Sequence, residues 1–340
     1  MRARIRDLLG SALHAARLTH PGRGGQGRLT IVTLHRVLPD PQRAAYPLPG
    51  LAVRPERLAW LLAYFTRHYE CGPLVEVAAA WSAGLPTARP RLAVTFDDAL
   101  ADNFRHAAPI LERFGVRATF FVPCDAVEER KLLWHDRLAW AVQGAAGLRP
   151  DAVRELLLDA GVPAAALGPA PPPVDLVLAL AKALDPASRE ALVRSSEALP
   201  GPGAPDWEGM SSWEDLAELH RRGHEIGSHS LSHPLLPQCD DAAVEREIAD
   251  SRRMIEARTG APVVSFCYPN GDFDERAVRA VERSGYRWAV TTAPGPNRRG
   301  ACPYTLRRVD LVEEHLVDRH GAASEARLAW RLSRLHPGVR

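Results

Sequence analysis

The stretch RLAVTFDDA, residues 91–99, carries the strongest information about the fold of this 340-residue chain. Residues 91–96 are mostly apolar or β-branched, which predicts a strand buried on both faces. Asp97 and Asp98 follow at once, and a helical pattern over 102–114 then ends at Gly115. A buried strand that leads through a short turn into a helix is typical of a parallel sheet covered by helices.

The same alternation of strand and helix runs outward from this stretch in both directions. Strands are expected at 29–35, 91–96, 116–122, 224–228, 263–268, 286–292 and 305–311. Helices are expected at 55–69, 102–114, 213–222, 242–259 and 274–284. Such alternation predicts an α/β fold with a parallel sheet, either doubly wound or closed. We favour a (β/α) barrel of about seven strands, because polar residues follow several different strands, where barrel loops build a site.

One region, at about 127–209, does not follow this alternation of strands and helices. It is rich in Ala, Leu and Pro and includes the breaker cluster GPAPPPVD at 168–175. We expect a mostly helical insertion that either shapes the entrance to a site or is a surface elaboration. The expected organisation is a basic amphipathic segment at 1–27, the barrel with its insertion at 28–320, and a basic C-terminal helix at 321–340.

Composition narrows the class of protein. The hydrophobic fraction of 46% and charged fraction of 25% are those of an ordinary globular chain. A net charge of +2 gives no support for a nucleic-acid partner. The cysteines are odd in number, widely spaced and without a CxxC pair, so we expect a reducing, cytoplasmic compartment. They are Cys71, Cys124, Cys239, Cys267 and Cys302.

The two ends of the chain are similar in character. Residues 1–18 combine arginines with a short apolar run that Ser11 and His14 interrupt, which favours an amphipathic helix over a secretory leader. Residues 324–335 repeat this mixture of Leu and Arg. We expect both helices to pack on the outside of the barrel. The alternative is peripheral association with an anionic membrane, which would place the chain at the inner membrane surface.

The adjacent carboxylates of Asp97 and Asp98 are the first candidate site. Because strand side chains alternate and a turn follows, the two carboxylates are expected to face different surroundings. Two neighbouring anions are costly unless a cation or a proton intervenes. A divalent metal would resolve the conflict by binding one Asp and leaving the other as a base. The competing explanation is that Asp98 caps the following helix.

The segment HSLSH, His229 to His233, is the second candidate site. Two imidazoles four residues apart lie on one face if the segment is helical, and this spacing suits zinc. No Glu lies between them, so this is not the HExxH motif of metalloproteases. The pair alone is compatible with ordinary polar surface. Together with Asp98 it forms a two-histidine, one-carboxylate set that leaves a position open for water and substrate.

The segments TFDDA and HSLSH, in this order, resemble the polysaccharide deacetylase family, also called the NodB homology domain, of carbohydrate esterase family 4. The resemblance spans roughly residues 29–310, apart from the insertion. It implies a distorted (β/α) barrel that removes N-acetyl groups from amino-sugar polysaccharides. It also implies that Asp97 is the general base and that Asp98, His229 and His233 bind the metal. Zinc is our first choice for these donors.

A third segment resembles the aromatic-Pro-x-Gly motif of one branch of the family. It comprises Tyr268, Pro269, Asn270 and Gly271, and we expect it to border the substrate. The alternative is a plain turn, which Pro-Asn-Gly would form in any case.

The chain also departs from the family pattern. Many members carry an arginine two residues before this proline that orients the catalytic Asp, whereas Cys267 or Tyr268 stands there in this chain. Arg307 or Arg308 in the last strand is expected to replace it, and we place Arg308 among the substrate-binding residues.

The proton donor is the other departure. The family's late histidine has no counterpart in TLRRVDLVEEH, 305–315, and His315 lies too far along. His35 ends the first strand, where a barrel would direct it at the site, although a buried core histidine is the competing explanation. Either His35 or protonated Asp97 delivers the proton to the leaving amine, or the chain catalyses poorly.

These observations predict a metal-dependent hydrolase acting on an amino-sugar glycan or its precursor. One alternative is a small-molecule amidase of the same fold. Another is a carbohydrate-binding barrel with impaired catalysis, which the missing arginine and general acid favour. A purely structural barrel would not need both motifs.

Overall fold

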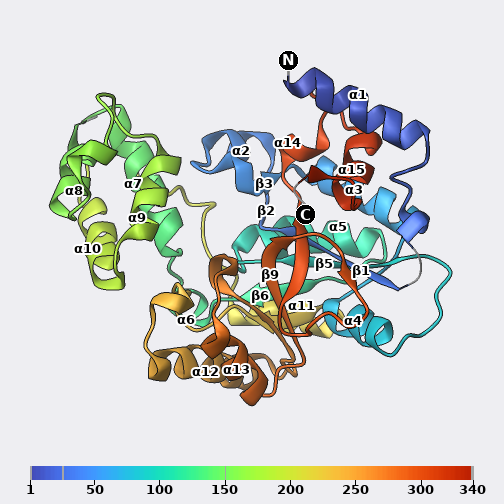
Figure 1. The fold of residues 1–340 in the computed structure, drawn as a ribbon. Coiled ribbons are helices and arrows are strands. Elements are labelled where there is room, and N and C mark those ends of the chain that lie inside the picture. Colours follow the sequence, from blue (N-terminus) through green and yellow to red (C-terminus); the bar gives the residue numbers. More distant parts are fainter. Residues whose placement is uncertain (1, 25–26, 150, 338–340) are drawn as a thin grey trace.

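Seven parallel strands close into a barrel (Figure 1). The computed structural model describes residues 2–24, 27–149 and 151–337, so the remaining residues of the expected segments 1–27, 127–209 and 321–340 lie outside the description. Around the barrel the order is β1, β11, β9, β8, β7, β6 and β5, and β5 pairs back with β1. The bounds are β1 Arg28–Leu34, β5 Arg91–Phe96, β6 Thr119–Val122, β7 Glu225–Ser228, β8 Ser265–Cys267, β9 Trp288–Pro294 and β11 Leu306–Asp310. The expected barrel is therefore confirmed.

The pairing of β1 with β5 closes the barrel and brings two candidate residues together. The two strands are in register from Leu29 opposite Arg91 to Leu34 opposite Phe96. Every residue of β5 is buried, as expected for a strand with one face in the barrel and the other under helices. His35 and Asp97, the next residue of each strand, consequently lie at the same rim.

Helices surround the barrel where the sequence predicts them. They are α3 Pro55–His68, α5 Ala108–Arg113, α11 Trp213–Arg221, α12 Asp241–Thr259 and α13 Glu275–Arg283. Gly115, Gly223 and Gly260 follow α5, α11 and α12 with positive φ, which releases the chain from the helix without a Cβ clash. Ser212 and Asp215 form a reciprocal capping box at the start of α11.

Several elements lie outside the expected alternation. A π-helical turn, η3 Asn103–Ala107, precedes α5, where Pro109 has no N–H to continue the ordinary helical ladder. The segment after α3 forms β4 Glu70–Gly72 and α4 Leu74–Ser82, and β4 extends the sheet beyond β5. The remaining short elements are η1 Pro21–Gly24, β2 Arg36–Val37, α2 Asp40–Ala45, η2 Pro49–Leu51, β3 Ala52–Val53, α6 Cys124–Glu128, η4 Ala164–Ala166, η5 Leu236–Gln238, η6 Pro269–Gly271, β10 Asn297–Arg298 and α14 Glu313–Leu316.

The segment between β6 and β7 forms a helical lobe beside the barrel mouth (Figure 1, green). Its helices are α7 Trp134–Ala146, α8 Ala152–Asp159, α9 Val174–Ala183 and α10 Pro186–Ser196. The lobe has a hydrophobic cluster of its own, which includes Leu138, Leu157, Val177 and Leu192. Because this cluster is separate from the barrel core, the lobe's position depends on the contacts at its edge.

The terminal helices pack against each other (Figure 1). Helix α1, Arg2–Ala15, lies along α15, Glu325–Leu332, and Asp7 accepts hydrogen bonds from the backbone of Arg319 and the guanidinium of Arg327. Leu328 and Leu332 of α15 are buried. Among the described helices none has the length and apolar character needed to cross a membrane.

Candidate active site

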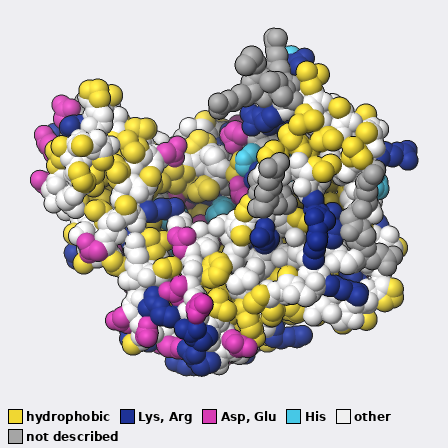
Figure 2. All heavy atoms as spheres, in the orientation of Figure 1, with side chains coloured by type: hydrophobic (Ala, Val, Ile, Leu, Met, Phe, Trp, Pro, Cys, Tyr) yellow, Lys and Arg dark blue, Asp and Glu magenta, His cyan; other side chains and the backbone are white. Residues whose placement is uncertain are grey.

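A pocket of about 530 Å³ lies at the carboxyl ends of the barrel strands, against the helical lobe. Figure 2 shows the surface hollowed between the lobe and the barrel, with histidine side chains visible in the hollow. The lining includes all the residues expected at a metal and a base, together with side chains of the lobe. It comprises His35, residues 47–51, Asp97, Asp98, His135, Asp175, Leu178, Ala179, Lys182, His229, His233, Asn270, Gly271 and Thr292.

The chain turns sharply after β5, and this turn separates the two carboxylates. Asp98 and Ala99 have φ values of 73° and 50°, which residues with a Cβ adopt at a cost. Asp98 does not cap the following helix. At the start of that helix Asp102 accepts hydrogen bonds from Arg36 and from the backbone of Val37. The cap explanation for Asp98 is therefore excluded, and its carboxylate is available to the pocket.

The segment from His229 to His233 is a loop, not a helix. Ser230 and His233 both have positive φ, so the i, i+4 face expected from helical spacing does not exist. Side chains hold the loop: the hydroxyl of Ser230 accepts from the backbone N–H of His233, and Glu247 accepts from the backbone of Leu231 and Ser232. The two imidazoles nevertheless meet, with their Nε2 atoms 3.3 Å apart.

Asp98 completes a cluster with these histidines. Its Oδ1 lies 3.5 Å from Nε2 of His229 and 3.6 Å from Nε2 of His233. Two donors at about 2.1 Å from a tetrahedral ion would be roughly 3.4 Å apart, so the three separations fit one ion held between them. Nδ1 of His229 lies 2.7 Å from the carbonyl oxygen of Cys267, which leaves Nε2 as the metal-facing atom. The donor set therefore fits a divalent metal.

Asp97 belongs to a different arrangement, a bidentate ion pair with Arg308. Nη1 and Nη2 of the guanidinium lie 2.7 Å from Oδ1 and Oδ2 respectively. Nε of Arg308 donates to the carbonyl oxygen of Thr291, so both side chains are held in one geometry. Burial would raise the pKa of Asp97, but the Arg308 guanidinium outweighs it and holds this pKa below its ordinary value. Asp97 is thus an ionised, oriented carboxylate beside the metal-binding cluster.

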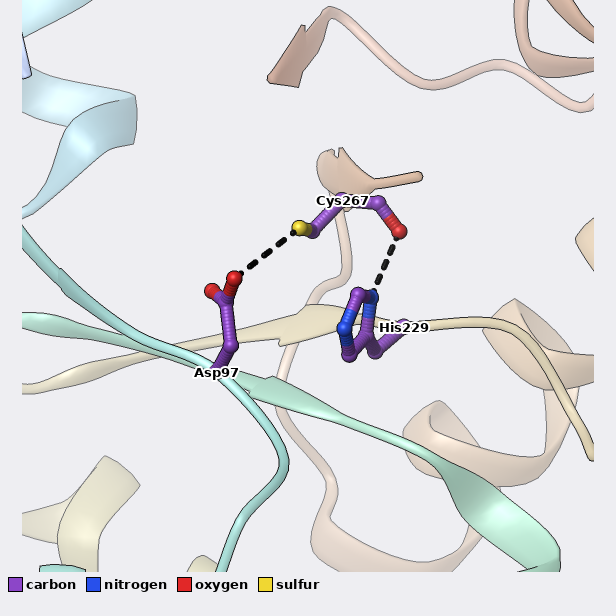
Figure 3. A group of neighbouring side chains, drawn as sticks. All are labelled: Asp97, His229 and Cys267. Carbon is purple, nitrogen blue, oxygen red and sulfur yellow. Dashed lines mark hydrogen bonds between the residues drawn. The ribbon is translucent and has the colours of Figure 1, made fainter. Parts of the chain in front are cut away.

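Cys267 lies between these two arrangements (Figure 3). Its thiol is 3.5 Å from Asp97 Oδ2 and 3.2 Å from the Arg308 guanidinium, and burial raises its pKa. Asp97, His229 and Cys267 could also be read as a metal site. We favour Asp98, His229 and His233, because a cation beside Asp97 would be repelled by Arg308. The small thiol of Cys267 instead accepts from the Arg308 guanidinium.

Some of the other expected residues line the pocket, and others do not. His35 lines the pocket, with Nε2 4.0 Å from Asp97 Oδ2. Asn270 and Gly271 line it too, whereas Tyr268 and Pro269 are buried behind it.

The substrate-binding role expected for Arg308 also differs from what the structure shows. We expected it to contact substrate, but it is buried, lies outside the described pocket lining and uses its guanidinium to hold Asp97. Of the two candidates for orienting the catalytic Asp, Arg307 is exposed and Arg308 is the one that does so.

Several pocket residues were missed from the sequence, and two of them, His135 and Lys182, carry groups that can bind ligands or protons. His135 opens α7 of the lobe, and its Nε2 lies 3.9 Å from Asp98 Oδ2 and 3.4 Å from Asp136 Oδ2. Lys182 lies on α9, and its Nζ donates to Oδ1 of Asn270 at 2.6 Å. Neither carries a motif, because each reaches the site only through the docking of the lobe. Lysine is rare in this chain, and that rarity was the one available signal for Lys182.

Comparisons with known proteins indicate the family and the fold of this chain. The polysaccharide deacetylase family model matches residues 84–165 and 189–289. Putative polysaccharide deacetylase YxkH of Bacillus subtilis is 31% identical over 96 residues, 28% of this chain and 34% of that protein, so the match spans about a third of that relative.

Solved structures with the same fold include two that cover most of this chain. The deacetylase PplD of Streptococcus pyogenes, in complex with acetate, is 17% identical with a TM-score of 0.58, over 86% of this chain and 95% of PplD. IcaB from Ammonifex degensii is 18% identical with a TM-score of 0.55, over 85% and 94% of the two chains. The family model covers more than half of the chain, and this chain belongs to the polysaccharide deacetylase family.

Proposed function

We propose that this protein is a metal-dependent hydrolase that removes N-acetyl groups from an amino-sugar glycan or from a precursor of one. The observation that carries the proposal is the convergence of Asp98, His229 and His233 beside a separate carboxylate, Asp97, at one pocket. A cluster of metal donors with an oriented base next to it is one arrangement that can catalyse amide hydrolysis.

We propose zinc as the metal, because two imidazoles and one carboxylate suit it and leave positions for water and substrate. A bound divalent ion would polarise the acyl oxygen and make water a better nucleophile near neutral pH. Asp98, His229 and His233 would hold it. The hydrogen bond between Nδ1 of His229 and the Cys267 carbonyl supports this role, because it fixes the ring with Nε2 toward the ion.

Asp97 would act as general base. Its carboxylate faces the pocket but is outside the donor set, and Arg308 keeps it ionised and oriented. It would take a proton from the water that attacks the amide carbon. The C–N bond then breaks only if the nitrogen gains a proton. His35 is our choice for that delivery, because its Nε2 lies 4.0 Å from Asp97 Oδ2, on the pocket wall.

The substrate class rests on family membership and on the pocket. The product would be acetate, the ligand named for the S. pyogenes deacetylase PplD. The lining combines charged and hydrogen-bonding groups with the apolar side chains of Leu48, Leu51 and Leu178, as expected for binding a sugar ring and its substituents. Activity on a small non-carbohydrate amide is the alternative within the same chemistry.

Acetate release from acetylated chitin oligomers and from small linear and cyclic amides tests this proposal. We expect release from the amino sugars, its loss with a chelator, its return with zinc, and its loss in Asp97→Asn. Asp206→Asn, an exposed site outside the pocket lining, is the matched control. Stoichiometric binding of metal and sugar without acetate release would instead support a carbohydrate-binding barrel. Hydrolysis confined to small amides would overturn the substrate class.

We also propose that the chain acts in the cytoplasm and that α1 contacts the inner membrane surface. Leu8 and Leu9 of α1 are exposed, whereas Leu328 and Leu332 of α15 are used in packing, so α1 is the better candidate. Sedimentation with anionic and neutral vesicles tests this proposal. Binding to anionic vesicles that is lost in Leu8→Ser/Leu9→Ser would support it, and equal sedimentation of both proteins would contradict it.

A further inference from the structure

One helix of the lobe presents a face to the pocket. Asp175, Leu178, Ala179 and Lys182 all line the pocket, and their i, i+3, i+4, i+7 spacing is one stripe of α9. Asp175 and Lys182 lie about 10 Å apart along the helix axis, so they do not neutralise each other directly. The stripe therefore offers an acid at one end, an apolar middle and a base at the other end.

Lys182 is a half-buried cation whose hydrogen bond goes to a neutral group. Its Nζ donates to Oδ1 of Asn270, and the amide of Asn270 is oriented by a second bond, from Nδ2 to Asp272 Oδ2 at 2.9 Å. Among the described residues, the Lys182 ammonium donates to this amide and forms no ion pair with a carboxylate. Burial lowers the pKa of the Lys182 ammonium, and the negative charges of Asp272 and Asp98 offset this effect only in part.

No other Lys or Arg side chain lines the pocket among the described residues. Arg308 and Arg36 lie nearby in the fold, but their guanidinium groups already form ion pairs. Arg308 pairs with Asp97, and Arg36 pairs with Asp102 and Glu208. Lys182 is accordingly the basic side chain that remains available to an anionic group in the pocket.

We propose that Lys182 is a specificity-determining residue that binds an anionic group, a carboxylate or a phosphate, carried by the substrate close to its N-acetyl group. This inference rests on the proposed deacetylase function. Leu178 and Ala179 would pack against the sugar between that anion and Asp175, whose negative charge disfavours the opposite orientation. A charge-assisted hydrogen bond in a partly desolvated pocket gives the larger gain over a neutral sugar.

Matched substrates test the proposal through kcat/KM. The neutral probe is N,N′-diacetylchitobiose, the carboxylate probe is a glucuronate–N-acetylglucosamine disaccharide, and the phosphate probe is N-acetylglucosamine 1-phosphate. We expect the wild type to have a higher kcat/KM for one of the two anionic probes than for the neutral probe. Which of the two it prefers identifies the anion as a carboxylate or a phosphate. Lys182→Met should lower kcat/KM for that probe about 10- to 100-fold and change the neutral probe less than about threefold. Lys182→Arg should retain the preference.

The chain supplies a control, because only two of its 43 basic Lys and Arg residues are lysines. Lys131 is exposed and lies outside the described pocket lining, so Lys131→Met should leave all three rates unchanged. If Lys182→Met lowered kcat/KM for every probe equally, Lys182 would only tie the lobe to Asn270 and the proposal would be wrong. A wild type without preference for an anionic probe would overturn it too.

Chemical labelling separates this inference from the proposed activity. The chelated protein is acetylated with an N-hydroxysuccinimide ester, and the extent at each lysine is measured by mass spectrometry. The preferred anionic probe should slow labelling of Lys182 but not of Lys131, and the neutral probe should slow neither. Labelling of Lys182 that no anionic probe slows contradicts anion binding, even if acetate is released. No acetate release from any probe contradicts the deacetylase function, even if Lys182 is protected.

Discussion

The barrel mouth and the helical lobe differ in how their charged side chains are paired. At the mouth the charged groups are buried and matched: Asp97 is held by Arg308, and Asp98 lies against His229 and His233. On the pocket face of the lobe, the partner of Lys182 among the described residues is a neutral amide. Buried, matched groups are positioned before substrate arrives, which suits chemistry, whereas a cation without a paired anion suits recognition. On the proposed function, the barrel would supply the reaction and the lobe would supply selection.

The lobe is itself attached through a buried polar network. The hydroxyl of Tyr46 donates to Asp136 at 2.7 Å, and Glu208 accepts from both Arg36 and the indole of Trp140. On the other side, Lys182 reaches Asn270 and Arg189 donates to Gln238. The network brings His135 and Lys182 to the pocket although the lobe has a separate core.

Loss of the donor cluster at the mouth should have the largest effect. We expect His233→Ala, or chelation of the wild type, to lower kcat by at least about 10³-fold, because both remove the proposed electrophile. Zinc should raise the melting temperature of the wild type and not that of the variant, since a ligand stabilises only the state that binds it. Calorimetry with and without zinc measures this. A zinc-bound, active His233→Ala would break the assignment of chemistry to this cluster.

The separation of the two carboxylates is tested next. Asp97→Asn should lower kcat about 10²- to 10⁴-fold, the range for loss of a general base, while metal content stays unchanged. Asp98→Asn should lower metal content instead. Elemental analysis beside steady-state kinetics distinguishes them. Loss of metal in both variants to the same extent would mean that the two carboxylates do not have separate roles.

Arg308→Met probes the ion pair that holds Asp97. We expect kcat to fall about 10²-fold through misplacement of the base. The free energy of unfolding should fall by about 3–5 kcal/mol, because a buried carboxylate loses its partner.

The pH dependence of kcat should also shift in a definite direction in Arg308→Met. Arg308 holds the pKa of Asp97 below its ordinary value, and burial alone would raise it. Without the guanidinium the carboxylate stays protonated to higher pH, so the acid limb of kcat should move upward in pH. An unmoved acid limb would show that Asp97 does not control it.

The smallest effect is expected at the attachment of the lobe. Tyr46→Phe removes the donor to a buried carboxylate, Asp136, and should lower the free energy of unfolding by about 1–3 kcal/mol. The kcat of the barrel chemistry should change little, and KM should rise as the lobe wall loosens. Denaturant unfolding and kinetics measure both. A loss of kcat as large as that of Arg308→Met would contradict the proposal that the barrel carries the chemistry and the lobe only the recognition.

Much of the barrel could be predicted because its strands and helices carry local signals. The buried run 91–96, the glycines after α5, α11 and α12, and the capping box at Ser212 each act over a few residues. The elements that were missed, such as β4 and α4, carry weaker patterns. The helix expected at 213–222 is α11. The helical turn on which the shared face of His229 and His233 depended does not form, because Ser230 and His233 adopt left-handed backbone held by side-chain bonds.

What the sequence determined by itself is the set of chemical groups and their order: two carboxylates at one strand end, then a histidine pair, on an alternating α/β pattern. Tertiary structure decided which groups meet. Arg308 and not Arg307 reaches Asp97, because side chains alternate along β11 and the packing of the barrel turns the face of Arg308 inward and that of Arg307 outward. His135 and Lys182 join the pocket through docking of a separate lobe. Local patterns depend on neighbours along the chain, whereas these contacts join residues tens to hundreds of positions apart, and only packing specifies them.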